Sequence, residues 1–193
     1  LAEPIMLLLY PLQRESALGA ASSLAILGIG VVFLALVQTF TAILQGLGRQ
    51  MIPVVNLFIG ALFKIAATFL LTGIYSINVR GAAVGTVLAY GVAAFLNYLA
   101  VKRLTKTKFP IGEFVIKPLI SVIAMSISVL FVYGRIVAFS GNSIATLASV
   151  AVGVIIFGLM LLATGAVKKA DFEMLPKGDK IAKMLSMIGL LRR

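Results

Sequence analysis

Lys64 is the residue of this sequence best placed to do chemistry. It is the only charge in an apolar segment, 53–75, that is long enough to cross hydrocarbon of about 30 Å. Its ammonium would lie about 15 Å from either interface, at a depth where insertion costs roughly 2.5–3.5 kcal/mol. No Asp or Glu lies in the predicted membrane spans. We therefore interpret Lys64 as an anion contact in a water-filled cavity, with pairing to an acid outside this sequence as the alternative.

Polar residues recur around Lys64 at helical spacing. One strip repeats every four residues: Asn56, Gly60, Lys64, Thr68 and Thr72. A second strip lies in the preceding apolar segment: Gln38, Thr41 and Gln45. Polar strips at membrane depth face the interior of a bundle or water. The candidate substrate contacts are Lys64, Asn56, Thr68, Gln38 and Gln45. Hydrogen bonding between helices without a ligand is the alternative, and for the second strip it is at least as well supported.

Small residues form another repeat of four. It runs through Gly81, Gly85, Ala89, Ala93 and Asn97, and a weaker version runs through Ala145, Ser149 and Gly153. Small residues at this spacing let membrane helices approach closely. We interpret both repeats as helix-packing surfaces.

Composition excludes most other classes of protein, including soluble domains. The chain is 61% apolar and 12% charged, with a mean hydropathy of +1.13, whereas soluble domains are about half apolar and a quarter charged. Cys and His are absent, and no nucleophile–base pair, carboxylate pair or metal cluster can be assembled. We predict no enzymatic activity, no cofactor and no metal. The net charge of +11 fits basic cytoplasmic loops, so we expect membrane lipids and no nucleic acid as partners.

Uncharged stretches predict an all-α polytopic membrane protein with five spans. They lie within 18–45, 53–75, 80–102, 118–139 and 135–168, and the fourth is broken by Gly134 and Arg135. Most basic residues lie in the loops 46–52 and 102–117 and in the tail from 168 onward. Only Arg14, Arg80 and Arg135 lie in the opposite loops. This bias predicts a cytoplasmic C-terminus.

The predicted organisation has five parts. Residues 1–17 would be the end of a preceding helix and an outer loop, 18–102 three helices, and 103–117 a basic cytoplasmic loop. Residues 118–167 would form two further membrane helices, and 168–193 a basic tail with an amphipathic helix. Because 1–10 read as the tail of a helix, we expect the chain to be the C-terminal part of a longer protein.

Four short motifs resemble those of bacterial polysaccharide-export flippases. The first runs from Leu44 through Gly46 and Gly48 to Arg49 and is followed by Pro53. The others are 4–10 (PIMLLLY), 81–86 (GAAVGT) with Tyr90 and Asn97, and 176–181 (PKGDKI). Their order and spacing resemble the stage V sporulation protein B branch of the multidrug/oligosaccharidyl-lipid/polysaccharide exporter superfamily, over nearly the whole chain.

This resemblance implies the MATE-type fold, in which two six-helix lobes enclose a central cavity and two extra helices follow. The five spans would be helices ten to fourteen, and the N-terminal lobe of the same protein would be an essential partner. The implied activity is flipping of an undecaprenyl-pyrophosphate-linked sugar, such as a peptidoglycan precursor, across the bacterial cytoplasmic membrane. The implied substrate is thus a lipid-linked anion, and the implied setting is cell-wall synthesis during sporulation.

Two other functions remain open from the sequence. A multidrug/cation antiporter of the same fold would need membrane carboxylates, and the predicted spans contain none. A membrane scaffold without transport would explain the packing repeat but not Lys64. Replacing Lys64 by leucine should separate a scaffold from a flippase.

Overall fold

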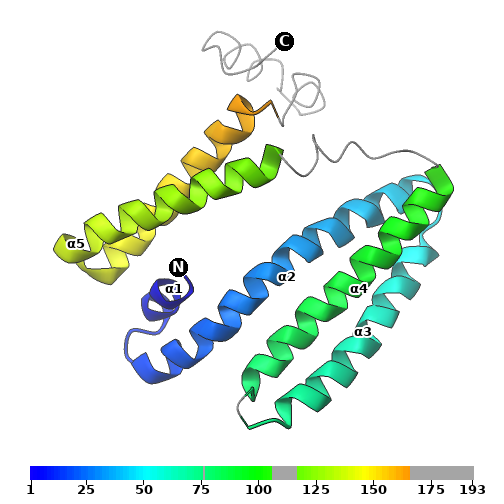
Figure 1. Ribbon diagram of the computed structural model, residues 1–193, viewed down its shortest axis with the longest axis horizontal. Coiled ribbons are helices and arrows are strands. Elements are labelled where there is room, and N and C mark those ends of the chain that lie inside the picture. The colour runs from blue at the N-terminus through cyan, green and yellow to red at the C-terminus, as the bar shows by residue number, and fades with distance from the viewer. Residues whose placement is uncertain (76, 106–116, 166–193) are drawn as a thin grey trace. The chain divides into compact units, whose positions relative to one another are not determined.

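The computed structural model describes residues 1–75, 77–105 and 117–165. These residues form five helices and no strand: α1 (Ala2–Leu9), α2 (Arg14–Gly46), α3 (Met51–Thr72), α4 (Val79–Thr105) and α5 (Lys117–Ala163) (Figure 1). The predicted all-helical class is confirmed. The predicted tail and its amphipathic helix, and most of the predicted loop 103–117, lie outside the described residues.

Four of these helices, α2 to α5, are long and apolar enough to span a membrane. Even the shortest, α3 with 22 residues, is about 33 Å long, which matches the hydrocarbon core. The buried apolar side chains are mostly alanines, whereas large side chains such as Phe69, Phe131 and Phe139 are exposed. Burying small residues and exposing large apolar ones suits a lipid solvent. The protein is therefore a helical membrane protein.

Residues 2–108 form one compact unit in which α4 lies between α2 and α3 (Figure 1). Helix α4 packs against both neighbours, which barely touch each other, and α1 packs on α2. Val37 of α2 and Ala93 and Ala94 of α4 make up the buried apolar cluster, with Phe33 packed against it. Every candidate residue around Lys64 belongs to this unit.

Helix α2 begins earlier than predicted. Residues 14–17 were expected in an outer loop, but they form the first turn of α2, with Glu15 in that turn. A carboxylate there is favourable beside the partial positive charge of a helix N-terminus. Ala17 and Ala21 are 1% and 2% exposed. Burial of these two alanines accounts for the earlier start of α2. The predicted start was based on the spacing of charged residues, which does not reveal such packing.

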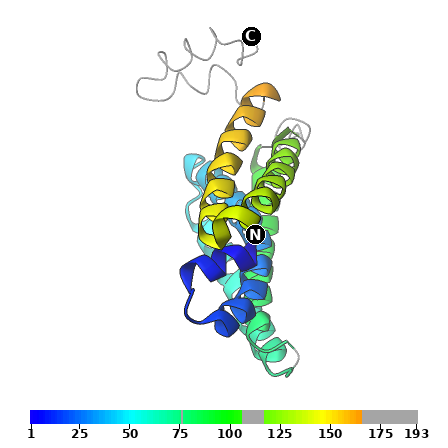
Figure 2. The same cartoon turned by 90° about the vertical axis from the view of Figure 1, so that its left-hand side faces the viewer.

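The other unit contains α5, a hairpin of two helical arms that meet at Gly141 and run side by side (Figures 1 and 2). The arms correspond to the last two predicted spans, but the predicted break at Gly134 and Arg135 is wrong. Gly134 stays helical, and Gly141 makes the turn with φ 73° and ψ 176°. That region is open essentially to glycine alone. Gly153 packs between the arms, where an added Cβ would lie 2.7 Å from Val129 Cγ2.

Candidate functional site

The polar strip of α3 and the small-residue strip of α4 face each other. A Cβ placed on Gly60 would lie 2.6 Å from the carbonyl oxygen of Ala89 and 3.4 Å from the Cβ of Ala93. Gly60, Ala89 and Ala93 are all buried. At this point the backbones of α3 and α4 are so close that no side chain fits between them.

The same close contact continues toward the start of α4. A Cβ on Gly85 would lie 2.5 Å from Thr68 Oγ1 and 3.2 Å from the carbonyl oxygen of Lys64, and one on Gly81 would lie 2.8 Å from Leu71 Cβ. Each step of four residues along α3 is matched by a step of four back along α4. The two repeats noted separately in the sequence are therefore the two sides of one interface.

A hydrogen-bonded chain closes the other end of this interface. Asn56 Nδ2 donates to Asn97 Oδ1 at 2.8 Å, and Asn97 Nδ2 donates to Thr41 Oγ1 at 3.3 Å. Asn97 is fully buried. The rings of Phe40 and Tyr98 pack 5.8 Å apart between the same two helices, α2 and α4. These hydrogen bonds connect α3, α4 and α2 through Asn97. The sequence alone does not predict this central role of Asn97.

Lys64 differs from the two adjacent members of its strip, Gly60 and Thr68, because its side chain is exposed. About 12 Å of helix separates it from Asn56 on one side and from Thr72 on the other. Glu3 and Glu15 are the only acidic residues in the described part of the chain, and they belong to α1 and the start of α2. Helix α3 thus presents one ammonium at membrane depth without a carboxylate on the same helix.

The remaining candidate contacts do not gather around Lys64. Asn56 and Thr68 take part in the contact between α3 and α4, and Thr68 Oγ1 is buried without a hydrogen-bond partner in the described structure. Gln38 and Gln45 are exposed and lie outside the Asn97 network, which uses Thr41 from their strip. Among the described residues, the structure therefore brings polar groups together at Asn97 rather than at Lys64.

The Gly-rich motif between α2 and α3 forms a helix stop. The amide of Arg49 donates to the carbonyl oxygen of Leu44 at 2.9 Å, and that of Gly48 donates to the carbonyl oxygen of Gln45 at 2.9 Å. Gly48 has a φ of 72°. This pair of bonds with a left-handed glycine is the Schellman motif. Pro53 then lies in the first turn of α3, where its missing N–H costs nothing.

Replacing Gly48 by alanine should therefore destabilise the turn, while replacing Gly46 should not. A non-glycine residue in the left-handed region costs about 1–2 kcal/mol, whereas Gly46 is helical and nothing lies within 4 Å of its added Cβ. We expect Gly48→Ala to lower the free energy of unfolding by about 1 kcal/mol, measured by unfolding in mixed detergent–SDS micelles. Equal effects at both glycines would contradict this account of the motif.

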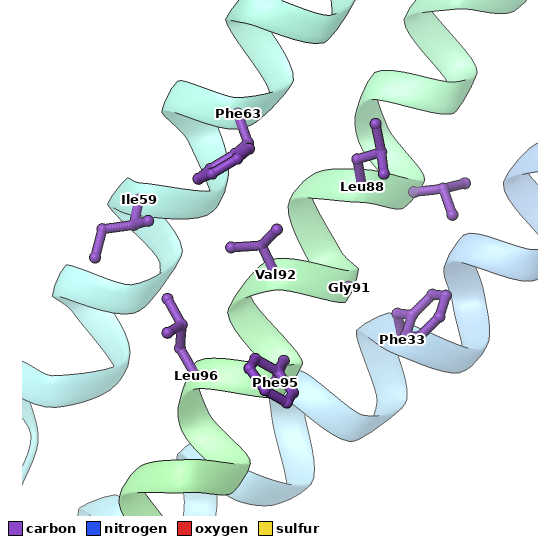
Figure 3. A pocket seen from close by; sticks show the side chains of 9 residues that line it. Phe33, Ile59, Phe63, Leu88, Gly91, Val92, Phe95 and Leu96 are labelled. Atoms are coloured by element: carbon purple, nitrogen blue, oxygen red, sulfur yellow. The ribbon is translucent and has the colours of Figure 1, made fainter.

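A groove of about 540 Å³ opens along α4, between residues of α2 and α3 (Figure 3). Its lining is wholly apolar and includes Phe33, Phe63, Leu88, Val92 and Phe95. None of the five candidate contacts lines it. This groove is therefore not the polar cavity predicted from the strips.

The α5 hairpin has a small polar network of its own. Tyr133 OH donates to Asn142 Oδ1 at 2.9 Å across the turn, and Thr146 Oγ1 donates to the same oxygen at 3.4 Å. Ser149 and Ala145 are buried in the second arm, at two of the three positions of the weaker packing repeat. Within the described ranges, no group of three or more His, Cys, Asp and Glu residues could hold a metal ion.

Comparison with known proteins gives no match: no family model, no curated protein and no solved structure matches this chain. The resemblance to polysaccharide-export flippases therefore rests on the short motifs alone.

Proposed function

We propose that the chain is part of a transporter that flips an undecaprenyl-pyrophosphate-linked sugar across the bacterial cytoplasmic membrane by alternating access. The observation that carries this proposal is the exposed ammonium of Lys64 on a membrane-length helix. In this proposal the C-terminus is cytoplasmic, and an N-terminal lobe of the same protein completes the cavity. The substrate class, a sugar on a lipid-linked pyrophosphate, comes from the motif resemblance.

The physical argument begins with the cost of a charge in hydrocarbon. A lysine at this depth is unfavourable unless water, a counter-charge or an anionic ligand surrounds it. Helix α3 supplies no acid, and the acids of the described helices are near the N-terminus. A pyrophosphate that crosses the membrane has the complementary charge, and lysine binds phosphate groups as a point charge. Lys64 therefore supports an anionic substrate.

The packing of α3 on α4 supports the transport mechanism in a second way. Alternating access is largely a rocking motion of rigid helix bundles around a fixed site. Glycines that bring α3 and α4 into backbone contact, and the Asn97 network that adds α2, favour movement of these three helices as one body. Lys64 would move with this body.

A non-transporting scaffold is the second candidate, and the close packing of α3 on α4 favours it. It predicts that a charge at position 64 is dispensable. The cation antiporter is less well supported, because α3 and α4 contain no acidic residue and α2 has only Glu15 in its first turn.

Flipping assays with Lys64 variants test the proposed function. In proteoliposomes that contain the complete transporter, a fluorescent undecaprenyl-pyrophosphate disaccharide would be followed by dithionite quenching. We expect Lys64→Leu to slow flipping by roughly 10- to 150-fold, because a charge-assisted bond to phosphate is worth about 1.5–3 kcal/mol. Lys64→Arg should retain most of the activity, since it keeps the charge.

Arg80→Leu is the matched control, because it removes one exposed basic residue at the end of a span. It should flip at the wild-type rate, and all variants should be present in equal amounts in the membrane. Wild-type flipping by Lys64→Leu would contradict the proposed role of Lys64, and no flipping by the wild-type protein would favour the scaffold.

A further inference from the structure

Arg135 is the only charged residue between positions 118 and 165, and it is exposed. It lies in the first arm of α5, before the turn at Gly141. The helix rise places its Cα about 9 Å from that turn. Each arm is about as long as the hydrocarbon core is thick. If the arms span the membrane, the turn lies at an interface, and the long arginine side chain can extend toward it.

The guanidinium of Arg135 lies over the ring of Phe131, with 5.3 Å between its Cζ and the ring centroid. Phe131 is 63% exposed, so the pair lies on the outer surface of the hairpin. A cation over an aromatic face is attracted by the ring, and this attraction orients the guanidinium while leaving its N–H donors accessible.

Three polar side chains near the turn are engaged with one another. Tyr133 and Thr146 both donate to Asn142 Oδ1, and the arm contains no carboxylate. The charge on Arg135 therefore has to be balanced from outside the hairpin. Phosphate is the anion present at every phospholipid interface, and the planar fork of arginine donates two parallel hydrogen bonds to it.

We propose that Arg135 and Phe131 form a binding site for the phosphate of a membrane phospholipid in the leaflet at the turn of α5. Phe131 packs against the top of an acyl chain, and Arg135 holds the headgroup phosphate. This site uses residues of α5 alone, whereas Lys64 belongs to α3, and the proposal does not depend on the transport function proposed above.

Native mass spectrometry of the complete protein, titrated with phosphatidylglycerol, tests this site. Wild-type protein should bind phosphatidylglycerol in preference to diacylglycerol with the same acyl chains, which lacks the phosphate. Arg135→Gln should raise the Kd of the tightest lipid site about tenfold. Arg135→Lys should fall between the two, because it keeps the charge but loses the fork.

Arg49→Gln is the control, because Arg49 is an exposed arginine of the turn after α2 and no ring lies under its guanidinium in the described structure. Its Kd should match that of the wild type. Equal binding of phosphatidylglycerol and diacylglycerol by wild-type protein would overturn the proposal, whatever the stability of the variants. An unchanged Kd in Arg135→Gln would overturn it as well.

Discussion

Gly60→Leu is expected to lower the free energy of unfolding of the α2–α4 unit by about 3 kcal/mol. Even the first carbon of a side chain at this position would lie 2.6 Å from the carbonyl oxygen of Ala89, and a backbone atom cannot move aside as a flexible side chain can. The two helices would have to separate, and overpacking of this kind costs about 1–3 kcal/mol or more. Separation would also strain the nearby contact between Gly85 and Thr68.

Unfolding in mixed micelles at increasing SDS fraction measures this effect, with Gly91→Leu as the matched control. Gly91 is in the same unit, and nothing lies within 4 Å of its added Cβ. Because leucine also has the better helix propensity, the control should be neutral or slightly stabilising. Equal destabilisation at Gly60 and Gly91 would show that α3 and α4 are not in backbone contact.

Asn97→Leu is expected to cost about 2 kcal/mol. Asn97 is fully buried and accepts from Asn56 while donating to Thr41. Its loss leaves the partly buried amide of Asn56 and hydroxyl of Thr41 without their partners, at about 1–3 kcal/mol for an unsatisfied group. Hydrogen bonds between membrane helices average only about 0.6 kcal/mol. We therefore expect the cost of Asn97→Leu to lie within the range of about 1–3 kcal/mol for one unsatisfied group rather than above it.

A double-mutant cycle with Thr41→Val measures the coupling directly. If Asn97 and Thr41 share a hydrogen bond, the double variant should be less destabilised than the two single variants together. Strict additivity would contradict the network, and a stable Asn97→Leu protein would show that the buried amide is dispensable.

The sequence predicted the two four-residue repeats that form the α3–α4 interface, but it did not predict that they pack against each other. A repeat of four with small and polar members is the same pattern whether it lines a cavity or packs on another helix. The α4 repeat, rich in glycine and alanine, was interpreted as packing. The α3 repeat was interpreted as a cavity because it contains Lys64. The equal period of the two repeats in neighbouring helices is the signal that indicates their contact.

The position of the turn in α5 could not be predicted from charge. Arg135 suggested an interface, and Gly134 beside it suggested a break, but an isolated glycine is tolerated within a helix at about 1 kcal/mol. The choice between Gly134 and Gly141 depends on how the two arms pack, for example Gly153 against Val129. Such contacts are distant in sequence and leave no local pattern.

Gln38 and Gln45 show that the sequence also could not predict which side chains of a polar strip meet a partner on another helix. Their spacing with Thr41 predicts one polar face, but only Thr41 is directed toward a polar partner on α4. The three positions lie within an arc of about 60°, but they are spread over about 10 Å along the helix axis, so they meet different parts of α4. Which member meets Asn97 depends on the crossing of α2 and α4.

The central claim is that Lys64 faces a water-filled cavity while its neighbours on α3 are packed or face lipid. These 193 residues contain no cysteine, so the single variants Lys64→Cys, Thr68→Cys and Phe69→Cys each place one thiol at a chosen position of this part of the protein. The complete protein in liposomes would be treated with a charged methanethiosulfonate, which reacts with the thiolate formed in water. We predict rapid modification at position 64, and protection at 68 by α4 and at 69 by lipid. Modification at position 64 no faster than at 69 would contradict the account.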